Sequence, residues 1–417
     1  MKKVLINILI ATLFVANTTI AQAATTDGTN VTSTVTSSDT TSAESVASSS
    51  DNNTIKISLA NIKDIIIENN QQAKIYDNTK KNAQLIYDDA KDAETSAQSE
   101  YDSANATYTS ELAAYNQDPT QNTQPSDSSV TDAKDKLVIA QNALDSDRYT
   151  LKTANIKYEQ NLETLVKQAQ TDYISYVLND LSNKDYSTAN VQLLKKAADA
   201  AKIQLDMGFL SKNDYTTAQL NYTNALNAAN TSNDAEENDK AKLLNDLGIS
   251  EGQNVVFDTN LDHDLQDVSK IVYDTDLQQM LDNNLNLQTD NISIDKASDE
   301  KDAETDGNDN LNEETDNNYD NAQMQLELDK NNAEKDFKTK YDALMNSYAT
   351  MKSSADSLQQ QKDNYNSAEV SYDYGFASQQ SVDESKVNSL KTSQNYQKDE
   401  ATFYENYLSY LEMKEGY

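Results

Sequence analysis

The chain has 417 residues, and its 69 Asp and Glu against 34 Lys and Arg give a formal net charge of -35. A surface so acidic repels phosphate groups, which argues against nucleic acid as a partner and against adsorption to anionic lipid. With 0 Cys, disulfides and lipid attachment through a cysteine are excluded.

The N-terminus has the order of residues found in a secretory signal. Met1-Lys2-Lys3 precedes an apolar run from Val4 to about Val15, and small residues lead to Ala23. We expect cleavage after Ala23, so that residues 1–23 are a signal peptide and the chain is exported. The alternative is a single uncleaved membrane anchor, for which the apolar run is short. Residues 24–54 are mostly Ser, Thr, Asp and Asn, which bury too little surface to offset chain entropy, so a disordered linker is expected.

A first long helix is expected from Ser58, a capping residue, to about Gln117. Its small and aromatic side chains recur with spacings of four and three, which keeps one thin seam on a partner helix and implies a left-handed supercoil. The alternative interpretation of so acidic a composition is a disordered chain, but such chains lack this regular helical spacing. The seam consists of Ala83, Tyr87, Ala90, Ala97, Tyr101, Ala104, Tyr108, Leu112 and Tyr115, with Glu94 at the one polar place.

Both prolines of the chain fall between residues 118 and 128, which predicts a loop. A second helix is expected from about Thr131, and no helix breaker occurs before Met207. At 1.5 Å per residue it would be about 115 Å long, so the fold is expected to be elongated.

Gly208 is expected to reverse the chain, with Asn213 or Asp214 capping a returning helix that ends at Gly248. An irregular stretch follows to about residue 269, and its Val255-Val256-Phe257 is expected to pack on the middle of the fold.

The second half repeats the same plan. Residues 280–284 echo residues 66–70, a very long helical run leads to Gly375, and a last helix follows that glycine. The sequence therefore predicts an all-α fold of duplicated coiled-coil hairpins with little or no β structure. We assign a first helical repeat to residues 55–269 and a second to residues 270–417.

From about Ser58 to the C-terminus the chain resembles the TolC-like outer-membrane efflux proteins. The likeness consists of the duplication, the order of the helices and a turn pattern present in both halves. In the second half the matching residues are Ala368, Tyr372, Gly375, Ser378 and Val382; in the first they are Ala201, Leu205, Gly208, Ser211, Asp214, Tyr215, Ala218 and Leu226.

The resemblance implies a homotrimer whose helices form a hollow α-barrel and which acts with a periplasmic-adaptor-type protein and an inner-membrane pump. The glycine turns would form its tapered end, where the adaptor docks through Gly208, Phe209, Ser211, Asp214, Gly375, Phe376, Ser378 and Val382. A pore constriction would fall on Tyr372, Ser381 and Glu384. The arginine that pairs with such a tyrosine in the best-known member of the family would fall on Ala377, so this chain lacks that basic partner.

The family normally inserts two membrane strands between the first two helices of each half. A membrane strand needs about 9 to 11 residues of alternating character. The matching segments, 116–130 and about 303–318, are too short and too polar to supply such strands. Direct membrane insertion is therefore not expected. The resemblance implies a place in the cell envelope at the outer membrane, or a wall-associated or extracellular one in a cell without that membrane.

Other chemistry finds little support in the sequence. The single His263 has no cysteine or second histidine nearby to complete a zinc site, and no serine lies in a glycine elbow beside a base. We therefore expect neither an enzyme nor a cofactor. A weak calcium candidate is Asp302, Glu304, Asp306 and Glu313, which partly follow the spacing of a calcium loop.

Two functions remain open. The first is an efflux or secretion duct subunit, selective through its diameter and acidic lining. The second is a non-transporting coiled-coil stalk or spacer of the cell envelope. The paired glycine turns favour the duct, and the missing strands favour the stalk.

Overall fold

Nearly all of the unit formed by Asn52–Tyr417 is helical in the computed structural model. The structure describes residues 54–120, 123–250, 252–259, 261, 268–302 and 309–417. The predicted signal peptide, most of the predicted linker and His263 lie outside the described residues. Among those residues, no helix is both long enough and apolar enough to cross a membrane.

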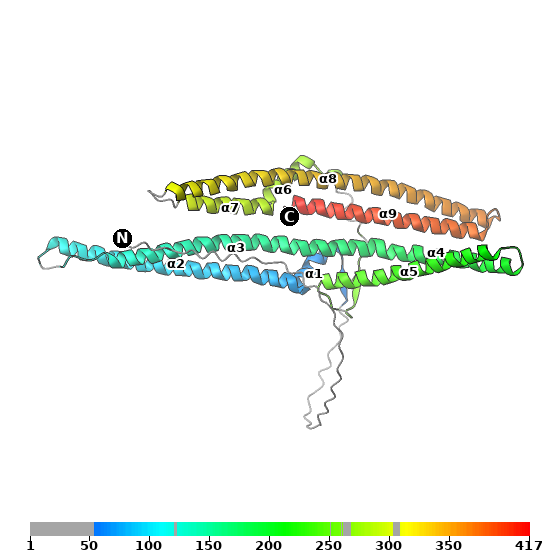
Figure 1. Ribbon diagram of the computed structural model, residues 1–417, viewed down its shortest axis with the longest axis horizontal. Helices are drawn as coiled ribbons and strands as arrows, with labels where there is room; N and C mark the ends of the chain where they lie inside the picture. The colour runs from blue at the N-terminus through cyan, green and yellow to red at the C-terminus, as the bar shows by residue number, and fades with distance from the viewer. Residues whose placement is uncertain (1–53, 121–122, 251, 260, 262–267, 303–308) are drawn as a thin grey trace, which may run out of the picture. The chain divides into compact units, whose positions relative to one another are not determined.

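The first half is built on one uninterrupted helix (Figure 1). α3 (Ser128–Ile174) passes through a π-helical segment (Ser175–Asp180) into α4 (Leu181–Asp206), a run about 120 Å long. α2 (Gln71–Gln117) lies along α3, and α5 (Lys212–Asp246) lies along α4. The long second helix and the loop before it are thus confirmed, while α1 (Ile62–Asn69) is separated from α2 at Asn70 instead of continuing into it.

The second half repeats this arrangement with one longer helix. α6 (Tyr273–Asn283) leads to α7 (Leu285–Asp302), and both α7 and α9 (Gln379–Lys414) pack along α8 (Asp309–Asp373). The break between α6 and α7 at Asn284 corresponds to the break at Asn70. The expected duplication is therefore present in the order of the helices.

The predicted seams are present along the paired helices. On α2, Ala83 is buried, and the remaining predicted positions from Tyr87 to Tyr115, Glu94 included, are half-buried. They face α3 of the same hairpin. Alanine and tyrosine alternate there because thin side chains let the helices approach while each ring keeps its hydroxyl near water.

The thick part of the core lies where α1 and two short strands, residues 55–57 and 255–257, meet the middle of the long helix, α8 and the ends of α5 and α9. Fully buried side chains there are Ile57, Ile62, Ile66, Tyr173, Leu243, Phe337, Phe403 and Tyr410. Phe337 and Tyr410 contact each other with ring centroids 5.1 Å apart. This core joins the two halves of the chain, because its residues come from both.

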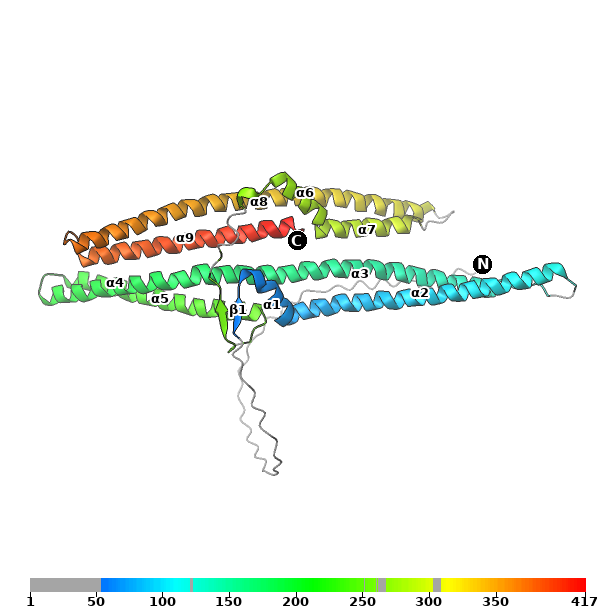
Figure 2. The ribbon, with the colours of Figure 1, turned by 180° about the vertical axis from the view of Figure 1, so that it is seen from behind.

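The described residues include one small sheet that the sequence pattern does not predict. β1 (Ile55–Ile57) pairs in parallel with β2 (Val255–Phe257), Ile55 opposite Val255 (Figure 2). The hydroxyl of Tyr173 donates to the backbone carbonyl of Asp258 and, at 3.3 Å, to that of Ile57. Val255-Val256-Phe257 was therefore expected correctly to pack on the middle of the fold. It was expected to be irregular, but it forms a strand.

Candidate functional site

The two glycine turns have the same backbone geometry. Gly208 and Gly375 adopt φ of 79° and 76°, a left-handed conformation that glycine reaches without strain. The N–H of Gly208 donates to Leu205 at 2.9 Å, and the N–H of the next residue donates to Gln204 at 2.8 Å. The bonds from Gly375 and its successor fall at the same spacing, 2.9 and 2.7 Å long. Both turns are Schellman motifs, which satisfy the last carbonyls of α4 and α8.

A serine three residues after each glycine starts the returning helix. The hydroxyl oxygen of Ser211 accepts the N–H of Asp214 at 3.1 Å, and its O–H donates to the Asp214 carboxylate at 2.8 Å. In the second turn the hydroxyl of Ser378 accepts the N–H of Ser381 at 3.2 Å. The expectation that Asn213 or Asp214 caps the helix was wrong, because an N-cap must precede the first helical residue, and that residue is Lys212.

Each turn exposes a phenylalanine. Phe209 is 79% exposed and Phe376 is 87% exposed, and Tyr374 beside the second turn is 75% exposed. An isolated exposed ring is unremarkable, but equivalent rings at two equivalent tips form a repeated apolar feature. Val382, predicted to belong to the same surface, is 7% exposed and packs inside the hairpin. It contributes to stability and not to the exposed tip.

The predicted constriction residues lie on the two sides of the second turn. Tyr372, 43% exposed, is in the last turn of α8, and Ser381 and Glu384 are exposed at the start of α9. The carboxylate of Glu384 accepts a hydrogen bond from Gln380 at 2.9 Å. Their role in a pore remains a prediction.

An ion pair beside these residues was not foreseen from the sequence. The ammonium of Lys196 on α4 lies 2.5 Å from the carboxylate of Asp383 on α9. The ion pair therefore joins the hairpin of α4 and α5 to the hairpin of α8 and α9. The hydrogen bond from Lys196 outweighs burial and lowers the pKa of Asp383 below its ordinary value. Residues 196 and 383 lie far apart in the chain, and the periodicity of either helix alone gives no sign of the contact.

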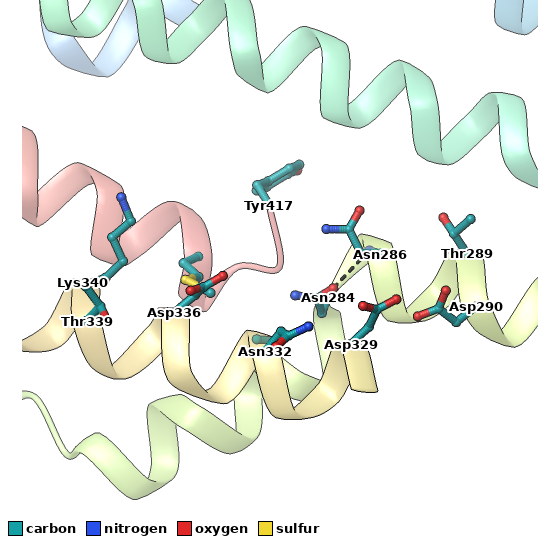
Figure 3. Close-up of a pocket in the computed structure, with 12 residues that line it drawn as sticks. Asn284, Asn286, Thr289, Asp290, Asp329, Asn332, Asp336, Thr339, Lys340 and Tyr417 are labelled. Atoms are coloured by element: carbon teal, nitrogen blue, oxygen red, sulfur yellow. Dashed lines mark hydrogen bonds between the residues drawn. The ribbon is translucent and has the colours of Figure 1, made fainter. Parts of the chain in front are cut away.

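A polar groove of about 590 Å³ lies between α7, α8 and the C-terminal residue (Figure 3). Figure 3 shows Asp290 on α7 facing Asp329 on α8, with Tyr417 above them. Within the described ranges, His, Cys, Asp and Glu form no group of three or more that could hold a metal ion. Of the calcium candidates, Glu304 and Asp306 lie outside the described residues, so calcium binding there stays a prediction.

Comparison with solved structures identifies the fold. No family model matches the sequence, and neither does any curated protein. A membrane protein from Pseudomonas aeruginosa aligns with a TM-score of 0.51 at 11% identity, over 85% of this chain and 93% of that one. The outer-membrane channel OprN aligns with a TM-score of 0.51 at 9% identity, over 86% of this chain and 90% of that one. The CmeC outer membrane channel of Campylobacter jejuni gives 0.49 at 13% identity, covering 86% and 85%.

The chain therefore shares the fold of TolC-like outer-membrane channels over most of its length. The resemblance inferred from the turns and the duplication is confirmed at the level of the fold. At such low identity the likeness establishes the fold alone.

Proposed function

We propose that this protein is exported and is a subunit of an efflux or secretion duct in the cell envelope. Three copies would assemble into a helical tube, and the tube would act with a periplasmic-adaptor-type protein and an inner-membrane pump. The duct would bind no nucleotide, and its selectivity would come from its diameter and from acidic side chains near the turns.

The pair of glycine turns carries this proposal. Two segments far apart in the sequence form the same Schellman turn, the same serine cap and the same exposed phenylalanine. The ion pair between Lys196 and Asp383 holds their helices side by side. A stalk or spacer needs long helices but has no use for two matched apolar tips. The tips are suited to a partner that contacts both at once.

Negative-stain images of the purified protein test the assembly. Trimeric particles with a central hole are expected from a duct. A solid rod of two or three copies would favour the stalk and rule out a tube.

Site-specific photocrosslinking tests the docking surface. A crosslinking residue at Phe209 or at Phe376 should capture a co-expressed adaptor. The matched control is Leu85 on α2, which is 61% exposed but lies on a different hairpin from the turns. Capture from Leu85 as strong as from the two phenylalanines would contradict docking at the tips.

A further inference from the structure

In the part of the chain that the structure describes, four buried carboxylate oxygens have no hydrogen-bond partner. One belongs to Glu412, whose other oxygen pairs with Lys167. Each of the other three belongs to an aspartate whose side chain faces a second aspartate across a helix interface. An ionised carboxylate only accepts hydrogen bonds, so two of them in contact leave a buried oxygen unsatisfied. One proton makes either member a donor to the other. The pairs are Asp180 with Asp239, Asp246 with Asp172, and Asp290 with Asp329.

The pair of Asp246 and Asp172 joins the end of α5 to α3. Lys242 lies 2.8 Å from one oxygen of Asp172, and the amide of Gln168 donates to the other at 3.0 Å. Burial would raise the pKa of Asp172, but these two hydrogen bonds keep it below its ordinary value. Asp172 is thus the ionised member. Burial and the hydrogen bond to Asp172 raise the pKa of Asp246 to about 6.

The pair of Asp180 and Asp239 joins the π-helical segment to α5. Burial, followed by the charge of Asp239, raises the pKa of Asp180 to about 6, and Glu236 on α5 adds to the effect. From α4, Lys184 approaches Glu236 at 3.2 Å. From α9, the amide of Gln394 donates to Asn183 and brings no charge.

The third pair lies in the second half of the chain. Asp290 on α7 and Asp329 on α8 border the groove of Figure 3, where α7 packs on α8. Burial and the charge of Asp329 raise the pKa of Asp290 above its ordinary value. The same arrangement therefore recurs in both halves.

We propose that these carboxyl pairs make the helix packing of this protein sensitive to pH, joining α5 to the long helix and α7 to α8 in acid and loosening both contacts as the protons leave. This device goes beyond the proposed duct and does not depend on it. It would let the same chain hold its hairpins tightly in an acidic envelope and more loosely at neutral pH.

Proton linkage determines whether the free energy of unfolding rises or falls with pH. Asp180 and Asp246 have higher pKa values in the folded chain than an unfolded aspartate, whose pKa is about 3.9. The folded state binds more protons between these values, so the free energy of unfolding falls as pH rises from about 4 to about 6. General repulsion within an acidic chain has the same sign, and a control must separate the two effects.

Thermal unfolding of the full chain, measured from about pH 4 to about pH 7.5, tests the device with a double variant, Asp180→Asn with Asp246→Asn. An amide donates a hydrogen bond without a titrating proton. We expect the wild-type unfolding midpoint to fall by several degrees across this range, and the variant to lose most of that fall. The control Asp234→Asn removes one charge from an exposed position of α5 and should keep the wild-type dependence. A double variant that keeps it too, or a control that loses it equally, overturns the proposal.

Hydrogen exchange on the wild type gives a second reading if the variant folds poorly. After correction for intrinsic rates, amides near the end of α5 should exchange faster at about pH 7.5 than at about pH 5, and those of α2 should not. A uniform change along the chain would contradict the proposal. So would Mg²⁺ or Ca²⁺ that stabilises the wild type at neutral pH but not the double variant, since the carboxylates would then hold a cation.

Discussion

Gly248 and Gly416 occupy equivalent places in the two halves of the chain. Each ends a helix with a positive φ, 73° at Gly248 and 99° at Gly416, and each lies against the backbone of an asparagine where two helices join. A Cβ at Gly248 would lie 2.6 Å from the carbonyl carbon of Asn69, and one at Gly416 would overlap Asn283. The carbonyl of Gly416 also accepts the N–H of Leu285 at 2.9 Å. The same close contact between a helix-ending glycine and the backbone of an asparagine therefore occurs in both halves of the chain.

Gly248→Ala should destabilise the protein far more than Gly252→Ala. Both glycines have positive φ, which costs an alanine about 1 kcal/mol, but only Gly248 touches backbone within reach of a Cβ. Backbone cannot move aside cheaply, so we expect at least about 2 kcal/mol more for Gly248→Ala. Urea unfolding measures both. Equal losses would show that the contact with Asn69 is loose in solution.

Asn70 and Asn284 should each be needed at the start of the helix that follows. The side-chain oxygen of Asn70 accepts two backbone N–H groups at 2.8 and 3.1 Å, and that of Asn284 accepts two at 3.0 Å. We expect about 1 kcal/mol lost for Asn284→Ala. Asn70→Ala should lose more, because the amide of Asn70 also donates to the carbonyl of Asp246 at 2.7 Å. The control Asn78→Ala, on the exposed face of α2, should be neutral or slightly stabilising.

These asparagines show what the sequence could and could not predict. The echo of residues 66–70 in residues 280–284 was visible, as were both turn glycines, because local patterns carry them. Gly416 has no local signal, since what constrains it is the distant Asn283. β1 and β2 escaped notice because three residues are too few to display alternation and each strand finds its partner about two hundred positions away. At the candidate site, the sequence placed Phe209 and Phe376 in the two turns, where the structure exposes both rings, and their docking role stays a prediction. The contact of Lys196 with Asp383 was not foreseen.

Tyr410→Phe should lower the free energy of unfolding by about 2 kcal/mol. The buried hydroxyl of Tyr410 donates to the carboxylate of Asp276 at 2.7 Å, and Lys414 lies 3.0 Å from the other oxygen. Phenylalanine keeps the ring packing but leaves a buried charge with one donor fewer. Urea unfolding measures the loss. Tyr374→Phe, at a site 75% exposed, is the matched control and should change nothing.

Measurements of unfolding free energy should distinguish the buried Val382 from the exposed Phe376 at the second turn. Val382→Ala removes two buried carbons and should lose about 1.5 kcal/mol. Phe376→Ala should leave the unfolding midpoint unchanged, because the ring is 87% exposed. If the tips dock an adaptor, Phe376→Ala should still weaken pull-down of that adaptor by tenfold or more. A large loss of stability in Phe376→Ala would place the ring in a contact within the protein.

The ion pair of Lys196 and Asp383 should hold the start of α9 against α4 without adding much to global stability. A partly exposed pair contributes about 0–1 kcal/mol, so a double-mutant cycle with both alanine variants should give a coupling in that range that disappears in high salt. Hydrogen exchange should respond more strongly, with faster exchange in the first turns of α9 in Lys196→Ala. The control Lys202→Ala removes a pair internal to α4, with Asp206 at 3.6 Å, and should leave α9 unchanged.

Because the pKa of Asp383 is lowered, the contact should persist at neutral pH and be lost only as pH falls through that lowered value. After correction for intrinsic rates, faster exchange of α9 at pH 7 than at pH 5 would contradict this assignment, since the carboxylate is already ionised across that range.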